Sequence, residues 1–270
     1  MIELAPNHKI GLPLHNPVLI ASGCGGYGDA YRNLVDLAVF GAIVTNPITL
    51  RPRRGLVPPR LVETRAGFIF DTGQQNPGVR KVIQQYRKVW SRLGVPLIAH
   101  LPVDEPDDLR RTAGALASTE TVAAIELGLP PAARPVDIER WIRAVREDAQ
   151  LPLLVKLPLE GVVDIAEVVA ATATDALVIT APPVGAAPSP LTGEIVSGYL
   201  YGPAVYSLVL AAVQAVSKLV ELPLIAAGGV QSVADTQAFL QAGASAVQLD
   251  SLLFLDPQAA YRIALTCQPG

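Results

Sequence analysis

The chain has 270 residues, of which 50% are hydrophobic and 17% charged, and its formal net charge is −3. This length allows one large α/β barrel or two ordinary domains. The weak negative charge, without a stripe of Lys and Arg between aromatic residues, argues against a nucleic-acid partner.

The first predicted element is an N-terminal hairpin. Segment 2–14 contains two short alternating runs around Asn7 and His8, and we expect these runs to pair and close the bottom of a barrel. The N-terminal region has no basic segment followed by an apolar one, so it does not resemble a secretory signal.

From residue 18 onward, short β-rich segments alternate with longer amphipathic ones, as in βα units with a parallel sheet. The predicted strands are 18–21, 42–45, 96–100, 122–127, 153–156, 176–180, 224–227 and 246–249. No linker composition or internal repeat divides the chain. We therefore predict the α/β fold class and one domain over residues 1–270, a (β/α)8 TIM barrel with an N-terminal β-hairpin closing its bottom.

Helix signals fall between these strands. Ser232, with Asp235 three residues later, predicts a helix start, and Gly243 predicts its end; Gly41 and Gly94 are likewise placed where helices would stop. The apolar stretch 206–220 is interrupted by polar residues and falls short of a membrane span. We expect a soluble, cytoplasmic protein with no membrane partner.

Two connections are longer than usual. Segments 46–76 and 181–203 follow the second and sixth predicted strands. Both begin at strand carboxyl ends, which form the catalytic face of a barrel. We therefore expect these two segments to cover a binding site.

Short motifs along the chain together resemble one enzyme family, in the same order and from residue 16 to about residue 257. They include Asn16-Pro17-Val18, Ala21-Ser22-Gly23, Ile48-Thr49-Leu50-Arg51-Pro52-Arg53, Gln75-Asn76-Pro77-Gly78, Ala124-Ile125-Glu126-Leu127, Val155-Lys156-Leu157, Gly202-Pro203-Ala204, Gly228-Gly229 and Ala242-Gly243-Ala244-Ser245-Ala246-Val247-Gln248. By these motifs the sequence is similar to the class 1, cytosolic dihydroorotate dehydrogenases.

The resemblance implies a cofactor, a reaction and partners. Members of this family use FMN to oxidise dihydroorotate to orotate in pyrimidine biosynthesis, with a cysteine as the base in class 1. The flavin takes hydride from one ring carbon while the base removes a proton from its neighbour. Class 1 proteins also form dimers, and one branch pairs with an iron–sulfur flavin subunit. The resemblance therefore implies a small-molecule ligand, a homodimer and an electron-transfer subunit.

The catalytic residues of the family are replaced in this chain. The family's catalytic segment, Asn-x-Ser-Cys-Pro-Asn, aligns with Gly-Leu-Pro-Pro-Ala-Ala at residues 128–133 of this chain. The residues of this chain have no side chain able to accept a proton. Four further substrate-binding features change: Asn46 replaces a lysine, Phe70 and His100 replace asparagines, and Ala181 with Pro182 replaces an Asn-Thr pair. Loss of a base costs about 10²- to 10⁴-fold in rate, and each lost hydrogen bond about 1–3 kcal/mol. We expect dihydroorotate turnover to be lost.

The two cysteines, Cys24 and Cys267, lie far apart without metal-ligand spacing, so we expect neither a disulfide nor a metal site. In the family the position of Cys24 lies near the flavin, and Cys24 is therefore a candidate substitute base. Free cysteines are commonly buried, and we interpret Cys24 as a small buried residue in place of the family's threonine.

The flavin-binding residues are retained in part. Lys156 matches the family lysine that contacts the flavin ring, where a cation stabilises the reduced flavin anion. The alternative is a lysine whose apolar stem lies along the barrel mouth while its amine stays in water. The resemblance assigns cofactor binding to Ala21, Ser22, Gly23, Lys156, Gly202, Gly228, Gly229 and Ser251. Gly228-Gly229 resembles the phosphate-binding turn. Against this, Asp250 brings a carboxylate near the phosphate, and Tyr201 is placed to crowd the ribityl chain.

Three functions remain open. The first is an FMN-dependent oxidoreductase acting on another substrate, and the second is a catalytically silent barrel that binds a ligand or regulates a partner. The third is a non-flavin barrel enzyme in which His100, Lys156, Asp250 and Asp71 converge as acid, base or Schiff-base groups. His100 and Lys156 are the candidate catalytic residues, and we interpret Glu126 as a structural charge paired inside the barrel.

Overall fold

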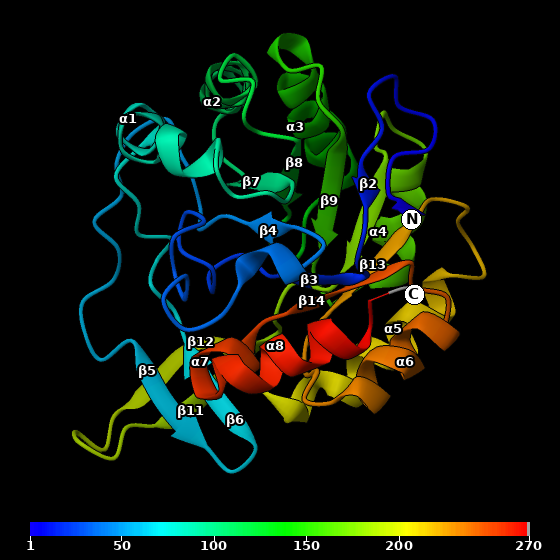
Figure 1. Ribbon diagram of the computed structural model, residues 1–270. Coiled ribbons are helices and arrows are strands. Elements are labelled where there is room, and N and C mark those ends of the chain that lie inside the picture. The colour runs from blue at the N-terminus through cyan, green and yellow to red at the C-terminus, as the bar shows by residue number, and fades with distance from the viewer. Residues whose placement is uncertain (269–270) are drawn as a thin grey trace.

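The computed structural model describes residues 1–268 and contains a closed barrel of eight parallel strands (Figure 1). Around the barrel the strands run in the order β10-β13-β14-β3-β4-β7-β8-β9. Their bounds are β3 (Val18–Ile20), β4 (Ile43–Val44), β7 (Leu97–Pro102), β8 (Ala124–Gly128), β9 (Leu153–Leu157), β10 (Ala176–Ile179), β13 (Leu224–Ala227) and β14 (Ala246–Leu249). Each predicted strand overlaps one of these, so the (β/α)8 prediction is confirmed.

The barrel strands are apolar because both of their faces are buried. Every residue of β9, β10, β13 and β14 is buried, as expected for parallel strands covered by helices. Inward-facing side chains fill the barrel axis, among them Leu19, Val44, Ile98, Leu154, Val178 and Ile225. The barrel interior is therefore a packed core.

The predicted N-terminal hairpin is also present. β1 (Ile2–Glu3) and β2 (Pro13–Leu14) pair antiparallel, with Ile2 opposite Leu14. Leu4, Leu12 and Leu14 are buried in the same apolar cluster as the inward side chains of the strands. That cluster includes Ala42, Ala124, Ala176 and Ala246 at strand starts, so the hairpin closes the amino-terminal end of the barrel.

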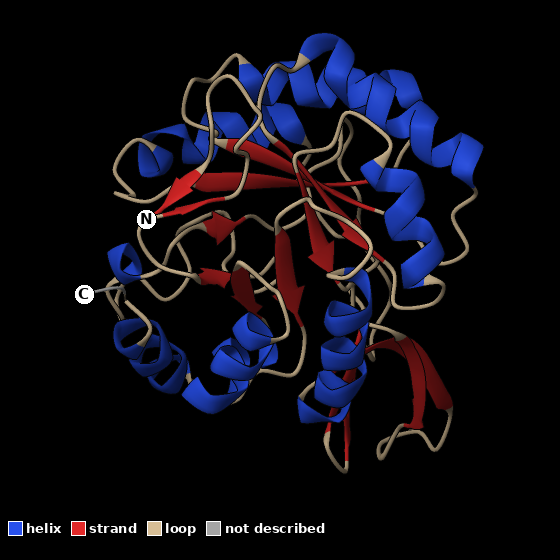
Figure 2. Cartoon of the chain, turned by 90° about the vertical axis from the view of Figure 1, so that its right-hand side faces the viewer, coloured by secondary structure: helices blue, strands red, loops and turns tan. Residues whose placement is uncertain are grey.

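Helices surround the strands (Figure 2). They are α1 (Val79–Trp90), α2 (Pro106–Ala117), α3 (Pro135–Asp148), α4 (Val162–Ala170), α5 (Tyr206–Val216), α6 (Val233–Gln241), α7 (Ser251–Leu255) and α8 (Pro257–Thr266), with 3-10 turns η1 (Leu37–Val39) and η2 (Pro203–Val205). Ser232 accepts a hydrogen bond from the Asp235 N–H at the start of α6, and Gly243 follows its end with a φ of +110°, both as predicted. Within residues 1–268, no helix is long and apolar enough to cross a bilayer.

The helix predicted before Gly41 is wrong, because only η1 precedes this residue. The chain from β3 to η1 runs through turns and contains Gly23, Gly25, Gly26 and Gly28. Glycine costs about 1 kcal/mol relative to alanine within a helix, and four glycines close together disfavour a helix here. Gly94 follows α1 after a short turn.

The two long connections form a second sheet. β5 (Leu61–Thr64), β6 (Gly67–Phe70), β11 (Val184–Pro188) and β12 (Ile195–Tyr201) pair antiparallel in the order β11-β12-β6-β5. Tyr199 pairs with Phe70, which joins the two connections across the barrel mouth. This sheet projects beyond the barrel in Figures 1 and 2. The segments expected to cover a site are therefore ordered strands.

Candidate active site

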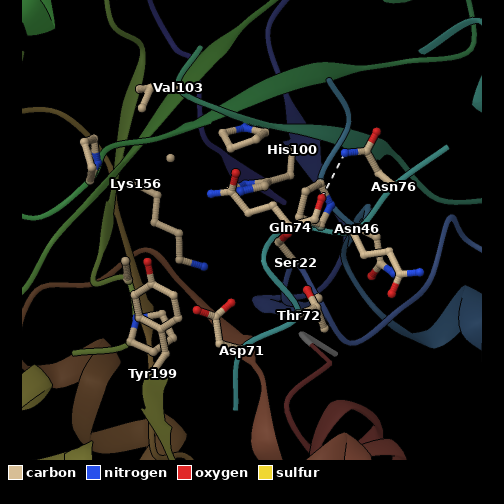
Figure 3. A pocket seen from close by; sticks show the side chains of 18 of the residues that line it. Ser22, Asn46, Asp71, Thr72, Gln74, Asn76, His100, Val103, Lys156 and Tyr199 are labelled. Atoms are coloured by element: carbon tan, nitrogen blue, oxygen red, sulfur yellow. Dashed lines mark hydrogen bonds between the residues drawn. The ribbon is translucent and has the colours of Figure 1, made fainter. Parts of the chain in front are cut away.

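A cavity of about 580 Å³ lies at the carboxyl ends of the barrel strands, beneath the second sheet. Its barrel wall includes Ser22 after β3, Asn46 after β4, His100 on β7, Gly128 at the end of β8 and Lys156 on β9. The second sheet and the loop after it contribute Phe70, Asp71, Tyr199 and Tyr201. Figure 3 shows Lys156, His100, Asp71 and Tyr199 around one space.

A buried polar network forms the floor of this cavity. The Lys156 Nζ donates a hydrogen bond of 2.8 Å to Gln248 Oε1 and lies 3.9 Å from Glu126 Oε1. Glu126 is fully buried and accepts hydrogen bonds from Gln248 Nε2 at 2.6 Å and from His100 Nδ1 at 2.8 Å. Glu126 is therefore paired inside the barrel, as predicted, and it connects both candidate catalytic residues.

The network keeps Glu126 ionised. Burial by itself would raise the pKa of this carboxyl, but the charge of Lys156 and the hydrogen bonds from His100 and Gln248 outweigh burial and lower the pKa from 4.5 to about 2. The carboxylate balances the Lys156 ammonium, whose side chain is 8% exposed. A buried lysine requires such a partner, and it is thus held charged at the cavity floor.

Two buried acceptors near the strand ends have no hydrogen-bond partner within residues 1–268. They are Asn46 Oδ1, in the cavity wall, and Thr180 Oγ1, which directly precedes the cavity-lining Ala181. Buried polar atoms are rarely left unpaired, since this costs about 1–3 kcal/mol. Of the two residues, Asn46 lines the cavity and Thr180 does not.

The predicted phosphate end lies beside the cavity. Gly228 and Gly229, after β13, have φ values of +132° and +78°, and a Cβ on Gly229 would lie 2.6 Å from the Tyr206 backbone N. Ser251 begins α7, and its hydroxyl is 3.5 Å from Gln231 Nε2, just after the glycine turn. The glycine turn and the start of α7 are therefore adjacent, as a phosphate site would require.

At the predicted phosphate end, Asp250 accepts the hydrogen bonds that Ser251 could donate to a phosphate. The Asp250 carboxylate accepts hydrogen bonds from both the N–H and the hydroxyl of Ser251. Burial raises the pKa of Asp250, and the Ser251 hydrogen bonds and the Lys156 charge only partly offset this effect. A carboxylate is thus built into the turn that would otherwise face a phosphate.

Aromatic side chains cover the same region. Tyr201 stacks on Phe68 with ring centroids 5.5 Å apart, and Phe70 and Phe254 pack against Phe68 edge-on. Burial raises the pKa of the Tyr201 phenol well above its usual value. Tyr201 therefore stays a neutral group that narrows the space beside Asp250.

The structure does not favour Cys24 as a base. Its side chain is buried and does not line the cavity. Burial, and next the Asp250 carboxylate, raises the pKa of the Cys24 thiol well above 9.0, although Lys156 partly opposes them. The thiol is protonated at neutral pH, in agreement with its interpretation as a small buried residue. Cys24 and Cys267 are both free.

The predicted site residues fall into two groups. Ser22, Gly23, His100 and Lys156 line the cavity, and Asp71 from the non-flavin hypothesis joins them. The others lie outside the cavity wall: Ala21, Gly202, Gly228, Gly229, Ser251 and Asp250. Sequence reasoning assigned no role to Gln248, which links Lys156 to Glu126. Its signal was a single polar residue within the apolar strand 246–249.

A closed parallel barrel with a polar cavity at the carboxyl ends of its strands is the architecture of barrel enzymes. Residues 6–267 match the family model described as dihydroorotate dehydrogenase. The chain therefore belongs to the dihydroorotate dehydrogenase family.

Curated relatives agree with this assignment. The chain is 37% identical over 272 aligned positions to a protein of Desulforudis audaxviator, with 94% of this chain and 88% of that protein covered. It is 35% identical to a protein of Pelobacter propionicus (94% and 89% covered) and 33% identical to one of Bacillus pumilus (92% and 85% covered). All three are named dihydroorotate dehydrogenase B (NAD(+)), catalytic subunit.

Family membership is consistent with FMN as the cofactor. At the ring end the residues present fit a flavin, because Lys156 offers a buried cation at the cavity floor. The glycine turn after β13 is buried and lies outside the cavity wall. The Asp250 carboxylate is the one group among these that opposes a dianion, since like charges a few ångströms apart repel.

Proposed function

We propose that the chain is an FMN-dependent oxidoreductase acting on a small molecule other than dihydroorotate. The observation that carries this proposal is the Lys156–Gln248–Glu126 network, which holds a buried ammonium at the floor of the cavity. When bound, the flavin would accept hydride, and the Lys156 cation would stabilise its reduced anion. Ser22, Gly23 and Lys156 would hold the ring, and Gly228, Gly229 and Ser251 the phosphate.

The cavity wall supports a change of substrate. Residues 128–131, which replace the start of the family's catalytic segment, line the cavity with no group able to accept a proton. Ala181 and Pro182 line it where the family has its Asn-Thr pair. A dihydroorotate molecule in this cavity would lack both its base and several hydrogen-bond partners.

The visible absorption spectrum tests the cofactor. The purified protein is incubated with excess FMN and passed through a gel-filtration column, and we expect it to retain the flavin band near roughly 450 nm, which is the chromophore's own. Anaerobic addition of dihydroorotate should leave the band unchanged, whereas a screen of other reduced cyclic substrates should find one that bleaches it. Bleaching by dihydroorotate would overturn the change of substrate.

The second candidate function is a catalytically silent barrel that binds a ligand or a partner. The Asp250 carboxylate favours it, because it engages the Ser251 donors that a phosphate would use. A protein that remains colourless after incubation with FMN would exclude the flavoenzyme and favour this candidate.

We also propose two protein partners. The curated relatives are named as catalytic subunits, and by this relation an electron-transfer subunit is the partner that would reoxidise the flavin. A homodimer is supported by the second sheet, where Leu61, Val184, Leu191 and Ile195 are between 52% and 88% exposed. They lie on β5, on β11, in the β11–β12 loop and on β12, and exposed apolar surface of this kind is typical of protein interfaces.

Ile195→Asp is expected to convert the dimer to a monomer at micromolar concentration, because it places a charge within the apolar surface of the second sheet. Size-exclusion chromatography with light scattering measures the mass. The matched control is Leu265→Asp on α8, whose side chain is 43% exposed and which should leave the dimer intact. A monomeric wild-type protein, or a dimer that survives Ile195→Asp, contradicts the proposal.

A further inference from the structure

We propose that His100 is the general base of this cavity and replaces the cysteine that the chain lacks. The proposal rests on the proposed function, since it supplies the proton acceptor that an oxidoreductase of this type requires. Three features carry it: the Glu126 contact that sets the histidine tautomer, the space that Gly128 leaves for the ring, and the absence of a better-placed base among the described cavity residues.

Glu126 determines which ring nitrogen of His100 carries the proton. The Glu126 carboxyl is ionised because its pKa is about 2, and an ionised carboxylate can only accept hydrogen bonds. The contact of 2.8 Å between His100 Nδ1 and Glu126 Oε1 therefore requires a proton on Nδ1. In the neutral imidazole the Nε2 lone pair is then free to accept a proton. A carboxylate that orients a histidine in this way is a recurrent arrangement for a base.

Gly128 makes room for the ring. A Cβ at this position would lie 2.8 Å from His100 Cε1, closer than side chains tolerate, and 3.2 Å from Nε2. By the resemblance described above, the family has an asparagine at each of these two positions. Here a histidine and a glycine replace the two asparagines together, and the glycine leaves the space that the imidazole needs. Both residues line the cavity.

Other titratable groups of the cavity are less suited to accept a proton. They are Tyr27, Arg53, Asp71, Lys156, Glu160, Tyr199 and Tyr201. Lys156 is an ammonium paired with Glu126, and Arg53 is a cation paired with Asp104 at 2.9 Å. The Asp71 Oδ1 accepts the backbone N–H of Gly73, two residues further on, and Glu160 is exposed. The tyrosines are protonated at neutral pH. His100 is the cavity side chain that a buried carboxylate orients.

The chemistry follows from this position. His100 Nε2 takes a proton from a carbon next to a carbonyl group of the bound substrate, and the electron pair of the broken C–H bond stays on the substrate as an enolate. The imidazolium that forms is stabilised by the Glu126 carboxylate. The substrate class that this step requires is a carbonyl compound with a hydrogen on the carbon next to its carbonyl group.

The tautomer can be measured by long-range ¹H–¹⁵N NMR, because the chain has three histidines. His8 Nδ1 accepts the Ile10 N–H, and His15 Nε2 contacts the Ala38 carbonyl, so both carry the proton on Nε2. His100 should give the opposite pattern, with the proton on Nδ1. Glu126→Gln keeps an acceptor oxygen and should retain this pattern, whereas Glu126→Met should lose it. Both variants remove the carboxylate beside Lys156, so their difference isolates the acceptor.

Reactivity of Nε2 is tested with diethyl pyrocarbonate, which acylates unprotonated imidazole nitrogen. Trypsin places the histidines in separate peptides, 1–9, 10–32 and 93–110, so each rate is read by mass spectrometry. Gly128→Ala should lower the rate at His100 at least about tenfold, since the added methyl displaces the ring, and leave His8 unchanged. A proton on His100 Nε2, or an unreactive His100 in the wild type, overturns the proposal even if FMN is bound.

A substrate found in the flavin screen gives the kinetic test. His100→Gln should lower kcat by about 10²-fold or more with little change in KM, and the acidic limb of the pH profile should disappear. FMN retention should be unchanged, which separates failure of the base from failure of the flavoprotein proposal. An unaltered kcat in His100→Gln would exclude His100 as the base.

Discussion

Asp250→Gly is expected to tighten FMN binding by about 10- to 100-fold, equivalent to about 1.4–2.7 kcal/mol. The substitution removes the carboxylate that accepts the N–H and hydroxyl of Ser251, and it leaves both donors free for the phosphate. The Gly-Ser pair that results is close to the Gly-Thr pair of the family. Fluorescence titration of FMN measures the affinity, and flavin retained on gel filtration gives an independent readout.

The pH dependence of FMN binding distinguishes an effect of the Asp250 charge from an effect of the size of its side chain. Burial raises the pKa of Asp250, so the carboxylate takes up a proton as pH falls through this raised value, and FMN binding by the wild type should then strengthen. Asp250→Asn is the matched control, because it removes the charge and keeps the size; any change with pH that it retains belongs to the FMN phosphate. Equal affinities of wild type and both variants would show that Asp250 does not oppose the phosphate.

Lys156→Met is expected to destabilise the fold by about 3–5 kcal/mol, because it leaves the Glu126 carboxylate buried without its cation. The double variant Glu126→Gln/Lys156→Met removes both charges and should recover most of this loss. Urea unfolding of the single and double variants measures the coupling. A loss below about 1 kcal/mol in Lys156→Met would mean that the pair does not hold the cavity floor.

Acid unfolding provides a second readout of the same network. The pKa of Glu126 is about 2 in the fold against 4.5 for the unperturbed group, so the carboxylate contributes stability above pH 4.5 that is lost as pH falls toward 2. The size of this contribution is on the order of 3 kcal/mol. Glu126→Gln/Lys156→Met should lack it, and its stability should be flatter over this range. Equal acid dependence in both proteins would contradict the lowered pKa.

Much of the barrel could be predicted from local patterns. The strands read as apolar runs because both faces of each strand are buried, and the hairpin reads as an alternating pair. The helix predicted between β3 and η1 was wrong. It followed from the expected alternation of strands and helices, but the glycines of this region disfavour a helix. The second sheet could not be predicted, because Phe70 and Tyr199 pair only after the barrel brings two distant connections together.

The candidate site, like the fold, could be predicted from the sequence only in part. The sequence by itself determined that Glu126 is a buried charge and that His100 and Lys156 lie at strand ends, because polar residues within apolar strands must face a partner. Only the tertiary structure decided that Glu126, Lys156, His100 and Gln248 form one network and that Asp250 turns toward Ser251. The physical reason is closure of the barrel: inward side chains from strands more than a hundred residues apart share one interior, so Glu126 and Gln248, 122 residues apart, hydrogen-bond directly.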